Sequence, residues 1–188
     1  EAGVDALVAE GFEAGGHNGR EETTTFTLIP MVKEQIKIPL IAAGGIATGR
    51  GMLAAMVLGA DGVQIGSRFV ASEESSAHIN FKNKVIEAKD GDTLLTLKEL
   101  APVRLLKNKF SNDVLELYKS NPSKQDLIDL LGRARAKRGM FEGDIEDGEL
   151  EIGQITGLIN KIQPASKIVK EIISEFNFEK NNLKGIMF

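Results

Sequence analysis

The chain has 188 residues, of which 27 are acidic and 23 basic, so its net charge at neutral pH is −4. This balance argues against a nucleic-acid partner, which would need a basic surface, and the absence of cysteine excludes disulfides and thiolate metal sites. No apolar run approaches the roughly 20 residues that span a bilayer, and the first residues lack a signal-peptide pattern, so we expect a cytoplasmic protein without a membrane contact.

Short apolar runs alternate with helical patterns over residues 1–72. Each run is followed by glycine and is typical of a buried strand. Strands are indicated at residues 6–9, 39–43 and 62–65. Apolar residues recur at helical spacing between these runs. Strands that alternate with helices predict a parallel sheet with right-handed crossovers, in which ligands bind beyond the carboxyl ends of the strands.

The pattern changes after Phe69. Residues 73 to 140 are mostly helical in pattern, with Pro102 and Pro122 as punctuation. We therefore expect a helical lid or substrate subdomain over residues 73–150.

The last part of the chain has a different composition. Residues 142 to 151 are rich in Asp and Glu and indicate a solvated loop. Residues 151–188 are expected to form a return segment and an amphipathic helix that begins at Pro164. The tail from Asn177 is too polar to assign.

Glycines follow two neighbouring strands, as Gly44-Gly45 and as Gly66 before Ser67. Glycine lets backbone N–H groups approach a phosphate closely, and a helix that begins near Gly49 would add the positive end of its dipole. The last two strand ends of a barrel are a frequent phosphate site. The alternative is a pair of tight turns that need glycine for geometry alone, and spacing does not decide between the two.

The segment after the first strand contains His17 between Gly16 and Asn18-Gly19. A histidine on a strand-end loop is suited to proton transfer near neutral pH, and the alternative is an ordinary surface histidine. The other histidine, His78, lies in a helical pattern and is interpreted as structural. Two distant histidines without cysteine predict no metal site.

A basic run occupies the end of the third helical pattern in the predicted lid. It consists of Arg133, Arg135, Lys137 and Arg138. The favoured interpretation is a solvated helix end. The functional alternative is a docking surface for an acidic partner or a nucleotide phosphate.

Three segments together resemble one family. They are ALVAEGFEAGGHNG at 6–19, PLIAAGGIATGRGMLAAMVLGADGVQIGSRF at 39–69 and GQITGLI at 153–159. They are similar to the flavin-binding segments of the group that joins nitronate monooxygenases and enoyl-acyl-carrier-protein reductase II. The resemblance implies an α/β fold, namely the C-terminal part of an FMN-binding TIM (β/α)8 barrel with its last three strands, plus the helical lid. The first strand should then have an edge that this chain leaves unpaired.

The resemblance also implies a set of site residues. The catalytic histidine of the family matches His17. The positions that match its flavin-binding residues are Glu10, Gly15, Gly16, Gly44, Gly45, Gly66 and Ser67. No residue matches a metal ligand.

Two reactions are compatible with the resemblance. In the reductases, NAD(P)H reduces FMN, and an enoyl thioester on acyl carrier protein is then reduced. In the monooxygenases, alkyl nitronates are oxidised with O2. Glu10 and the run GSRFVASEES favour the reductase. Acyl carrier protein, a small-molecule substrate and a second copy of the chain are the candidate partners, and an inactive fragment or a flavin-free phosphate-binding module is the remaining alternative.

Overall fold

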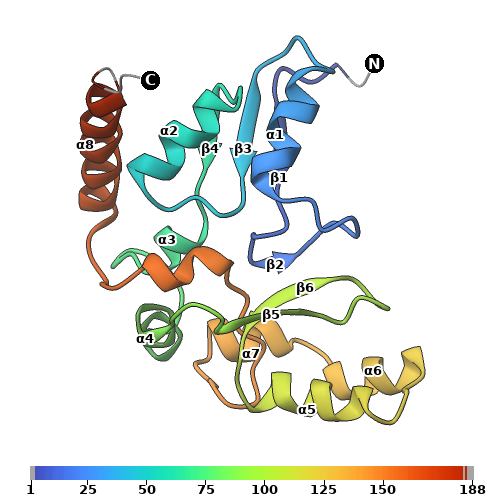
Figure 1. The fold of residues 1–188 in the computed structure, drawn as a ribbon. Coiled ribbons are helices and arrows are strands. Elements are labelled where there is room, and N and C mark those ends of the chain that lie inside the picture. The colour runs from blue at the N-terminus through green and yellow to red at the C-terminus, as the bar shows by residue number, and fades with distance from the viewer. Residues whose placement is uncertain (1–2, 184, 186–188) are drawn as a thin grey trace.

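The structure is a computed structural model that describes residues 3–183 and 185. It has a mixed α/β fold with two small sheets (Figure 1). The elements in chain order are β1 (Leu7–Glu10), β2 (Gly16–His17), α1 (Thr25–Lys33), β3 (Leu40–Ala43), α2 (Gly49–Val57), β4 (Gly62–Gln64), α3 (Ser67–Val70), α4 (Ile79–Glu87), β5 (Thr93–Thr96), β6 (Val103–Leu106), α5 (Lys109–Tyr118), α6 (Lys124–Leu131), α7 (Arg135–Met140), the 3-10 helix η1 (Gln154–Leu158) and α8 (Ala165–Leu183).

The first sheet is parallel and has the strand order β1-β3-β4. Leu7 pairs with Leu40 and Ile41 with Gly62, so β3 lies in the middle. Leu40 and Ala42 are fully buried, which explains why the central strand is apolar at every position. The three strands predicted from the apolar runs are confirmed to within two residues at each end.

Both outer strands of this sheet leave an edge without a partner among the described residues. β1 pairs with β3 alone, and β4 also pairs with β3 alone. Val8 of β1 is also 49% exposed, so the sheet face that carries its side chain is uncovered in addition to the edge. This agrees with the expectation that the first strand has an unpaired side.

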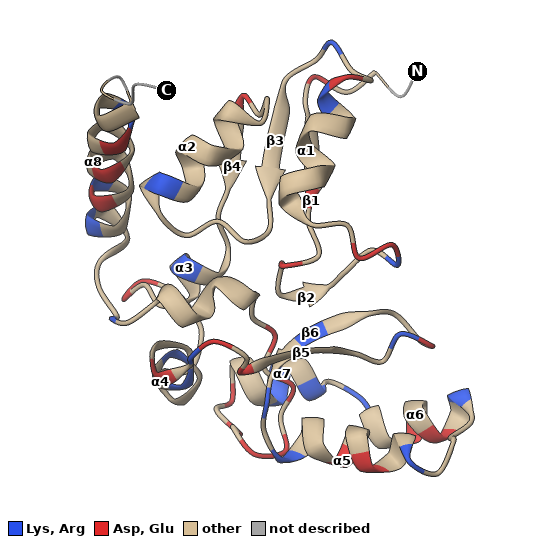
Figure 2. Cartoon of the chain, viewed as in Figure 1, with Lys and Arg blue, Asp and Glu red and all other residues tan. Residues whose placement is uncertain are grey.

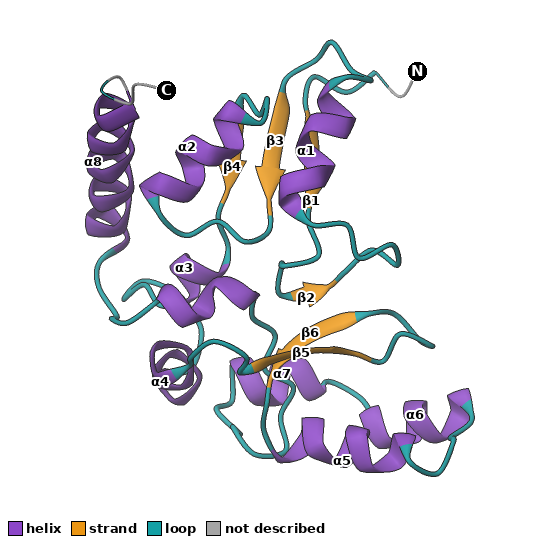
Figure 3. Ribbon diagram, in the orientation of Figure 1, coloured by secondary structure: helices purple, strands orange, loops and turns teal. Residues whose placement is uncertain are grey.

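The second sheet is antiparallel and was not expected. β5 and β6 form a hairpin within the region predicted to be mostly helical, and β2 pairs with β6 through Gly16–Arg104 and His17–Val103. The prediction for residues 73–140 is therefore incomplete: the four helices α4 to α7 are present, but a hairpin separates α4 from α5 (Figure 3). The two sheets lie in different parts of the molecule, and β2 is the strand of the second sheet on the side toward the parallel sheet (Figure 1).

The hairpin is fixed by an apolar cluster and by helices with defined starts. One face of β6 packs Val103 and Leu105 against α5 and α6. Asn108 and Ser123 close capping boxes at the first turns of these two helices. His78 caps α4 by accepting a hydrogen bond from the Asn80 N–H at 3.1 Å, so it has a structural role.

The C-terminal helix α8 continues through Asn177 to Leu183, beyond the point where the sequence pattern became too polar to assign. It lies beside α2 (Figure 1). The N–H of Gly49 at the start of α2 donates to the Glu175 carboxylate at 2.7 Å. The expectation that this helix start serves a phosphate is therefore wrong, because α8 occupies it.

In the described part of the chain, no helix combines the length and apolar character that a membrane crossing needs. The same residues contain no group of three or more His, Cys, Asp or Glu side chains arranged to hold a metal ion.

Candidate active site

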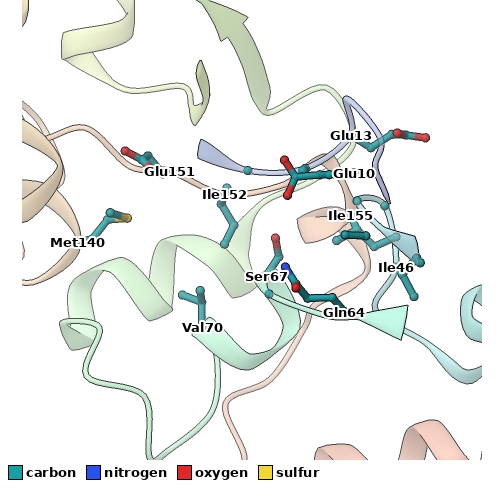
Figure 4. A pocket seen from close by; sticks show the side chains of 16 residues that line it. Glu10, Glu13, Ile46, Gln64, Ser67, Val70, Met140, Glu151, Ile152 and Ile155 are labelled. Carbon is teal, nitrogen blue, oxygen red and sulfur yellow. The ribbon is translucent and has the colours of Figure 1, made fainter. Parts of the chain in front are cut away.

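A pocket of about 200 Å³ opens at the carboxyl ends of the parallel strands. Its wall includes the last residue of β1, the turn after β3 and the turn after β4 (Figure 4). Six of the seven residues predicted to bind a cofactor line it: Glu10, Gly15, Gly44, Gly45, Gly66 and Ser67. The seventh, Gly16, is buried directly beside it. The geometry thus brings the glycines of three separate chain segments to one place.

The two glycine turns present backbone donors to this pocket. The N–H groups of Gly44, Gly45, Gly66 and Ser67 donate to no other described residue. Gly44 and Gly45 have φ angles of +88° and +66°, which a residue with a Cβ adopts only with strain. A Cβ at Gly66 would meet no atom within 4 Å, so that glycine leaves open space in front of the donors. Unpaired N–H groups around such a space fit a phosphate.

The return segment after the acidic region closes the pocket from the other side. The Gly153 N–H donates to Ser67 Oγ at 2.9 Å, and the Gln154 N–H donates to the Glu13 carbonyl at 2.9 Å. A Cβ at Gly15 would lie 2.3 Å from the Ile152 carbonyl carbon. Two segments of the resemblance, GQITGLI and the glycine loop, are therefore packed in direct contact.

His17 lies next to the pocket and does not line it. It is exposed at the end of β2, where it pairs with Val103. The neighbouring Asn18 holds the loop, because its side-chain amide donates to the Ala14 and Gly16 carbonyls at 3.1 and 3.0 Å. These hydrogen bonds hold the backbone on both sides of His17 in place.

Arg104, which the sequence did not single out, anchors the same loop from β6. It is 3% exposed, and its Nη2 and Nε donate to the Phe12 carbonyl at 2.9 and 3.2 Å. Its guanidinium also stacks on the Phe12 ring, 5.1 Å from the ring centre. Burial lowers the pKa of Arg104, and the carboxylates of Glu13 and Glu22 oppose that shift.

Three further carboxyl groups surround the loop or the pocket. Glu10 lines the pocket, and burial raises the pKa of its carboxyl group. Glu13 also lines the pocket, and it accepts hydrogen bonds from Thr25 N–H and Oγ1, both at 3.0 Å, which fixes the start of α1. Glu151 stands beside Met140, on the side of the pocket away from Glu13 (Figure 4).

The acidic region that ends at Glu151 is not a solvated loop throughout, which corrects the sequence interpretation. Glu149 is only 7% exposed, and Leu150 and Ile152 belong to the core. Burial raises the pKa of Glu149 to about 7; the charge of Glu151 adds to the shift, while the charges of His17 and Arg135 oppose it. Acidic and apolar residues alternate from 149 to 152, which is the period-two pattern of a strand. This pattern could have indicated a partly buried extended segment in place of a solvated loop.

The basic run of the predicted lid is largely engaged within the chain. Arg135 donates to the carbonyls of Leu130, Leu131 and Asp147, at 2.8, 2.6 and 2.6 Å. Lys137 pairs with Glu142 at 2.9 Å, and Arg138 pairs with Asp144 at 2.5 Å. Basic and acidic residues accordingly lie side by side around α7 (Figure 2). Arg133, Lys137 and Arg138 are exposed, which fits the interpretation as a solvated helix end, whereas Arg135 is half-buried and bonded to the chain.

A parallel sheet alternating with helices, with glycine turns at its strand ends whose N–H groups have no partner among the described residues, defines the chain as part of an α/β protein. The chain belongs to the nitronate monooxygenase family, whose model matches residues 1–175. It is 34% identical over 186 residues to a probable nitronate monooxygenase of Staphylococcus saprophyticus, a match that covers 94% of this chain and 52% of that protein.

Two solved structures are similar over almost the whole chain. FabK from Thermotoga maritima is 43% identical with a TM-score of 0.89, and the match covers 99% of this chain and 58% of that one. A nitroalkane oxidase from Streptomyces ansochromogenes is 30% identical with a TM-score of 0.80, and the match covers 97% and 54%. The chain thus spans about half the length of the curated relatives that it matches.

Proposed function

We propose that the chain is the C-terminal part of an FMN-dependent oxidoreductase that uses NAD(P)H to reduce an enoyl thioester on acyl carrier protein in the cytoplasm. The observation that carries the proposal is the set of free N–H groups at Gly44, Gly45, Gly66 and Ser67, grouped around one pocket. A flavin phosphate is an anion of the size and charge that such a set of donors binds.

The residues of the chain have distinct roles in this proposal. The two glycine turns would hold the phosphate, and Glu10 and Gly15 would line the flavin site. Bound FMN would supply hydride chemistry, accepting a hydride from NAD(P)H and delivering it to the substrate double bond. His17 would give a proton to the neighbouring carbon of the substrate from its ring N–H. The segment at Gly153 would exclude water from one side of the pocket.

The fold proposal extends the three-stranded sheet into a barrel. An open edge on β1 and another on β4 are unfavourable for a parallel sheet in water, and closing the sheet removes both. The curated relatives are about twice as long as this chain, which leaves room for further βα units. We infer that β1, β3 and β4 are the last three strands of an eight-stranded barrel.

The second candidate is oxidation of alkyl nitronates with O2. The family model and the curated relatives carry the name nitronate monooxygenase, which favours this reaction. When the neutral nitroalkane is the starting substrate, His17 would take its α-proton and so form the nitronate that is oxidised. The reductase is preferred because identity is higher to FabK, at 43%, than to the Staphylococcus saprophyticus relative, at 34%.

An activity comparison on the intact protein tests the proposal. NADH and NADPH oxidation is measured with a short enoyl thioester and without one, and oxygen consumption is measured with an alkyl nitronate. We expect nicotinamide oxidation that depends on the thioester and yields the saturated product. Oxygen consumption with the nitronate, in the absence of nicotinamide and without thioester reduction, would select the second candidate.

Docking of acyl carrier protein is a proposal of its own. Arg133 is exposed, and unlike the rest of the basic run it forms neither an ion pair nor a side-chain hydrogen bond with another described residue. We expect Arg133→Glu to raise the KM for carrier-bound substrate and to leave the KM for a small thioester unchanged, since only the docking interaction is lost. Equal effects on both substrates would remove the docking role.

A further inference from the structure

The extended segment around Glu151 lies on the edge of β6 that β2 also occupies. Arg104 pairs with Gly16 on this edge, and the next residue, Leu105, forms a bridge with Glu151. The opposite edge of β6 is taken by β5. Gly16 and Glu151 therefore lie next to each other along the same edge of β6. A Cβ at Gly16 would lie 2.6 Å from Glu151 Oε2. The carboxylate of Glu151 is in this way held beside the backbone that carries His17.

Glu149 lies two residues earlier on the same segment. The intervening Leu150 is 1% exposed and packs into the core, so the segment cannot turn freely. Glu149 itself is 7% exposed, and neither its carboxyl group nor that of Glu151 forms a hydrogen bond or ion pair with another described residue. Glu149 is buried and Glu151 is half-buried. Two carboxyl groups this close in the chain, withdrawn from solvent and without a protein donor, are costly as two anions, which favours a protonated form for one of them.

The charges that face this pair come from three elements. Burial is the main cause that raises the pKa of both carboxyls; the charge of Glu151 raises that of Glu149 further, to about 7. His17 on β2 opposes the shift of both groups, and Arg135 on α7 opposes that of Glu149. Because the two carboxyl groups interact, a proton on one of them lowers the cost of a charge on the other, and the raised pKa values of both favour such a shared proton.

We propose that Glu149 and Glu151 are a proton-storing carboxyl pair that restores the proton of His17 after each turnover. This inference rests on the proposed function. The proton given to the substrate leaves a ring N–H of His17. A new N–H bond forms at the ring as the O–H bond of the pair breaks, and an intervening water passes the proton between them. The carboxylate pair then takes a proton from solvent at the rim of the pocket. No electrons are exchanged in these steps.

The electrostatic part is tested without turnover, by carboxyl ¹³C NMR titration of the intact protein labelled at glutamate. We expect Glu149 to titrate near pH 7 and to move to lower pH in Glu151→Gln, because the neighbouring charge is lost. In His17→Gln both carboxyls should move to higher pH, because an opposing charge is lost. A Glu149 that titrates in the ordinary range of about 4–5, or carboxyls that do not respond to His17→Gln, would overturn the pair.

The transfer part is tested by the pH profile of turnover. Glutamine has the shape of protonated glutamate, so Glu149→Gln and Glu151→Gln should keep the fold, which the melting temperature checks. We expect each variant to lose turnover increasingly above pH 7 and less below it, whereas the exposed Glu146→Gln in the same acidic segment keeps the profile of the parent. Parent-like profiles in both variants would overturn proton supply.

The two parts separate this inference from the proposed function. If no enoyl thioester or nitronate is turned over, the proposed function fails, while the NMR coupling to His17 is still measured. If turnover is normal and the coupling is missing, the function stands and the carboxyl pair is refuted.

Discussion

At the scale of single residues, His17 carries the clearest expectation for catalysis. In either proposed reaction a proton is exchanged at this place, and a general acid or base contributes about 10²–10⁴ in rate. We expect His17→Ala in the intact protein to keep FMN, because the donors of the glycine turns are untouched, and to lose turnover by a factor in that range. Flavin absorbance and steady-state kinetics measure the two effects separately.

His78 provides the matched histidine control. It accepts a hydrogen bond from the Asn80 N–H, caps α4 and does not line the pocket. His78→Ala should lower the free energy of unfolding by about 1 kcal/mol and keep the turnover per folded molecule. Near-normal turnover in His17→Ala, with full FMN content, would remove His17 from the mechanism.

Gly66 allows the phosphate site to be tested with little damage to the fold. Its φ angle is −99°, and an added Cβ would enter open space. We therefore expect Gly66→Val to fold, with a melting temperature of the flavin-free protein close to that of the parent. Loss of one charge-assisted hydrogen bond, about 1.5–3 kcal/mol, corresponds to FMN binding that is roughly 10- to 150-fold weaker. Unchanged FMN affinity in a folded variant would argue against this anion site.

The predicted site residues belong to patterns of neighbouring residues in the sequence, whereas the missed ones depend on contacts between distant parts of the chain. Glycines at strand ends are a local pattern, and the predicted Gly44 and Gly66 line the same pocket. Arg104 acts on Phe12, far away in sequence, and nothing near it indicates that contact. Glu149 and Glu151 were hidden by composition, because an acidic region suggests solvent, although their alternation with apolar residues marks one buried face.

At the scale of elements, the contact between α2 and α8 makes a specific prediction at Gly49. A Cβ there would lie 2.2 Å from both the Ile172 carbonyl oxygen and the Phe176 nitrogen, which are backbone atoms and cannot rotate away. We expect Gly49→Ala to displace α8 and to lower the free energy of unfolding by about 1–3 kcal/mol. Thermal or denaturant unfolding of the intact protein measures the loss.

The same helix contains a control of opposite sign. At Gly51 an added Cβ would approach Thr48 Oγ1 to 3.4 Å and the Ile46 side chain to 3.7 Å, both ordinary contacts. Gly51→Ala should therefore stabilise the protein slightly, because alanine favours a helix over glycine by about 1 kcal/mol. If both variants change the free energy of unfolding by the same amount, the close packing of α8 on the start of α2 is not the reason that position 49 requires glycine.

The elements themselves were predictable where periodicity is local and were missed where pairing is distant. The βα units and the amphipathic part of α8 follow from spacing along the chain. The hairpin of β5 and β6 depends on β2, whose two residues Gly16 and His17 carry no periodic signal of their own. The start of α2 was assigned to the phosphate because helix starts favour anions, but Glu175 from the far end of the chain supplies that anion instead.

At the scale of the whole molecule, the arrangement of the two sheets explains the place of the site. The parallel sheet presents its strand ends to the hairpin, and the loop between β1 and β2 joins them (Figure 1). The return segment through Gly153 then closes the pocket before α8 packs back on α2. Residues between Glu10 and Ile155 thus meet at one pocket. Local sequence patterns cannot predict contacts between segments that lie so far apart in the chain.

The open edge of β1 leads to a prediction about the complete protein. The N–H groups of Leu7 and Gly11 donate toward the β3 side, to the Pro39 and Ala43 carbonyls, both at 2.9 Å. Since N–H direction alternates along a strand, the N–H groups of Val8 and Glu10 point to the open edge. If this edge pairs with another strand of a barrel, their amide hydrogens should exchange as slowly as that of Ala42 in the central strand. Native-state hydrogen exchange of the intact protein measures this, and fast exchange at Val8 and Glu10 beside a protected Ala42 would mean that the sheet ends at β1.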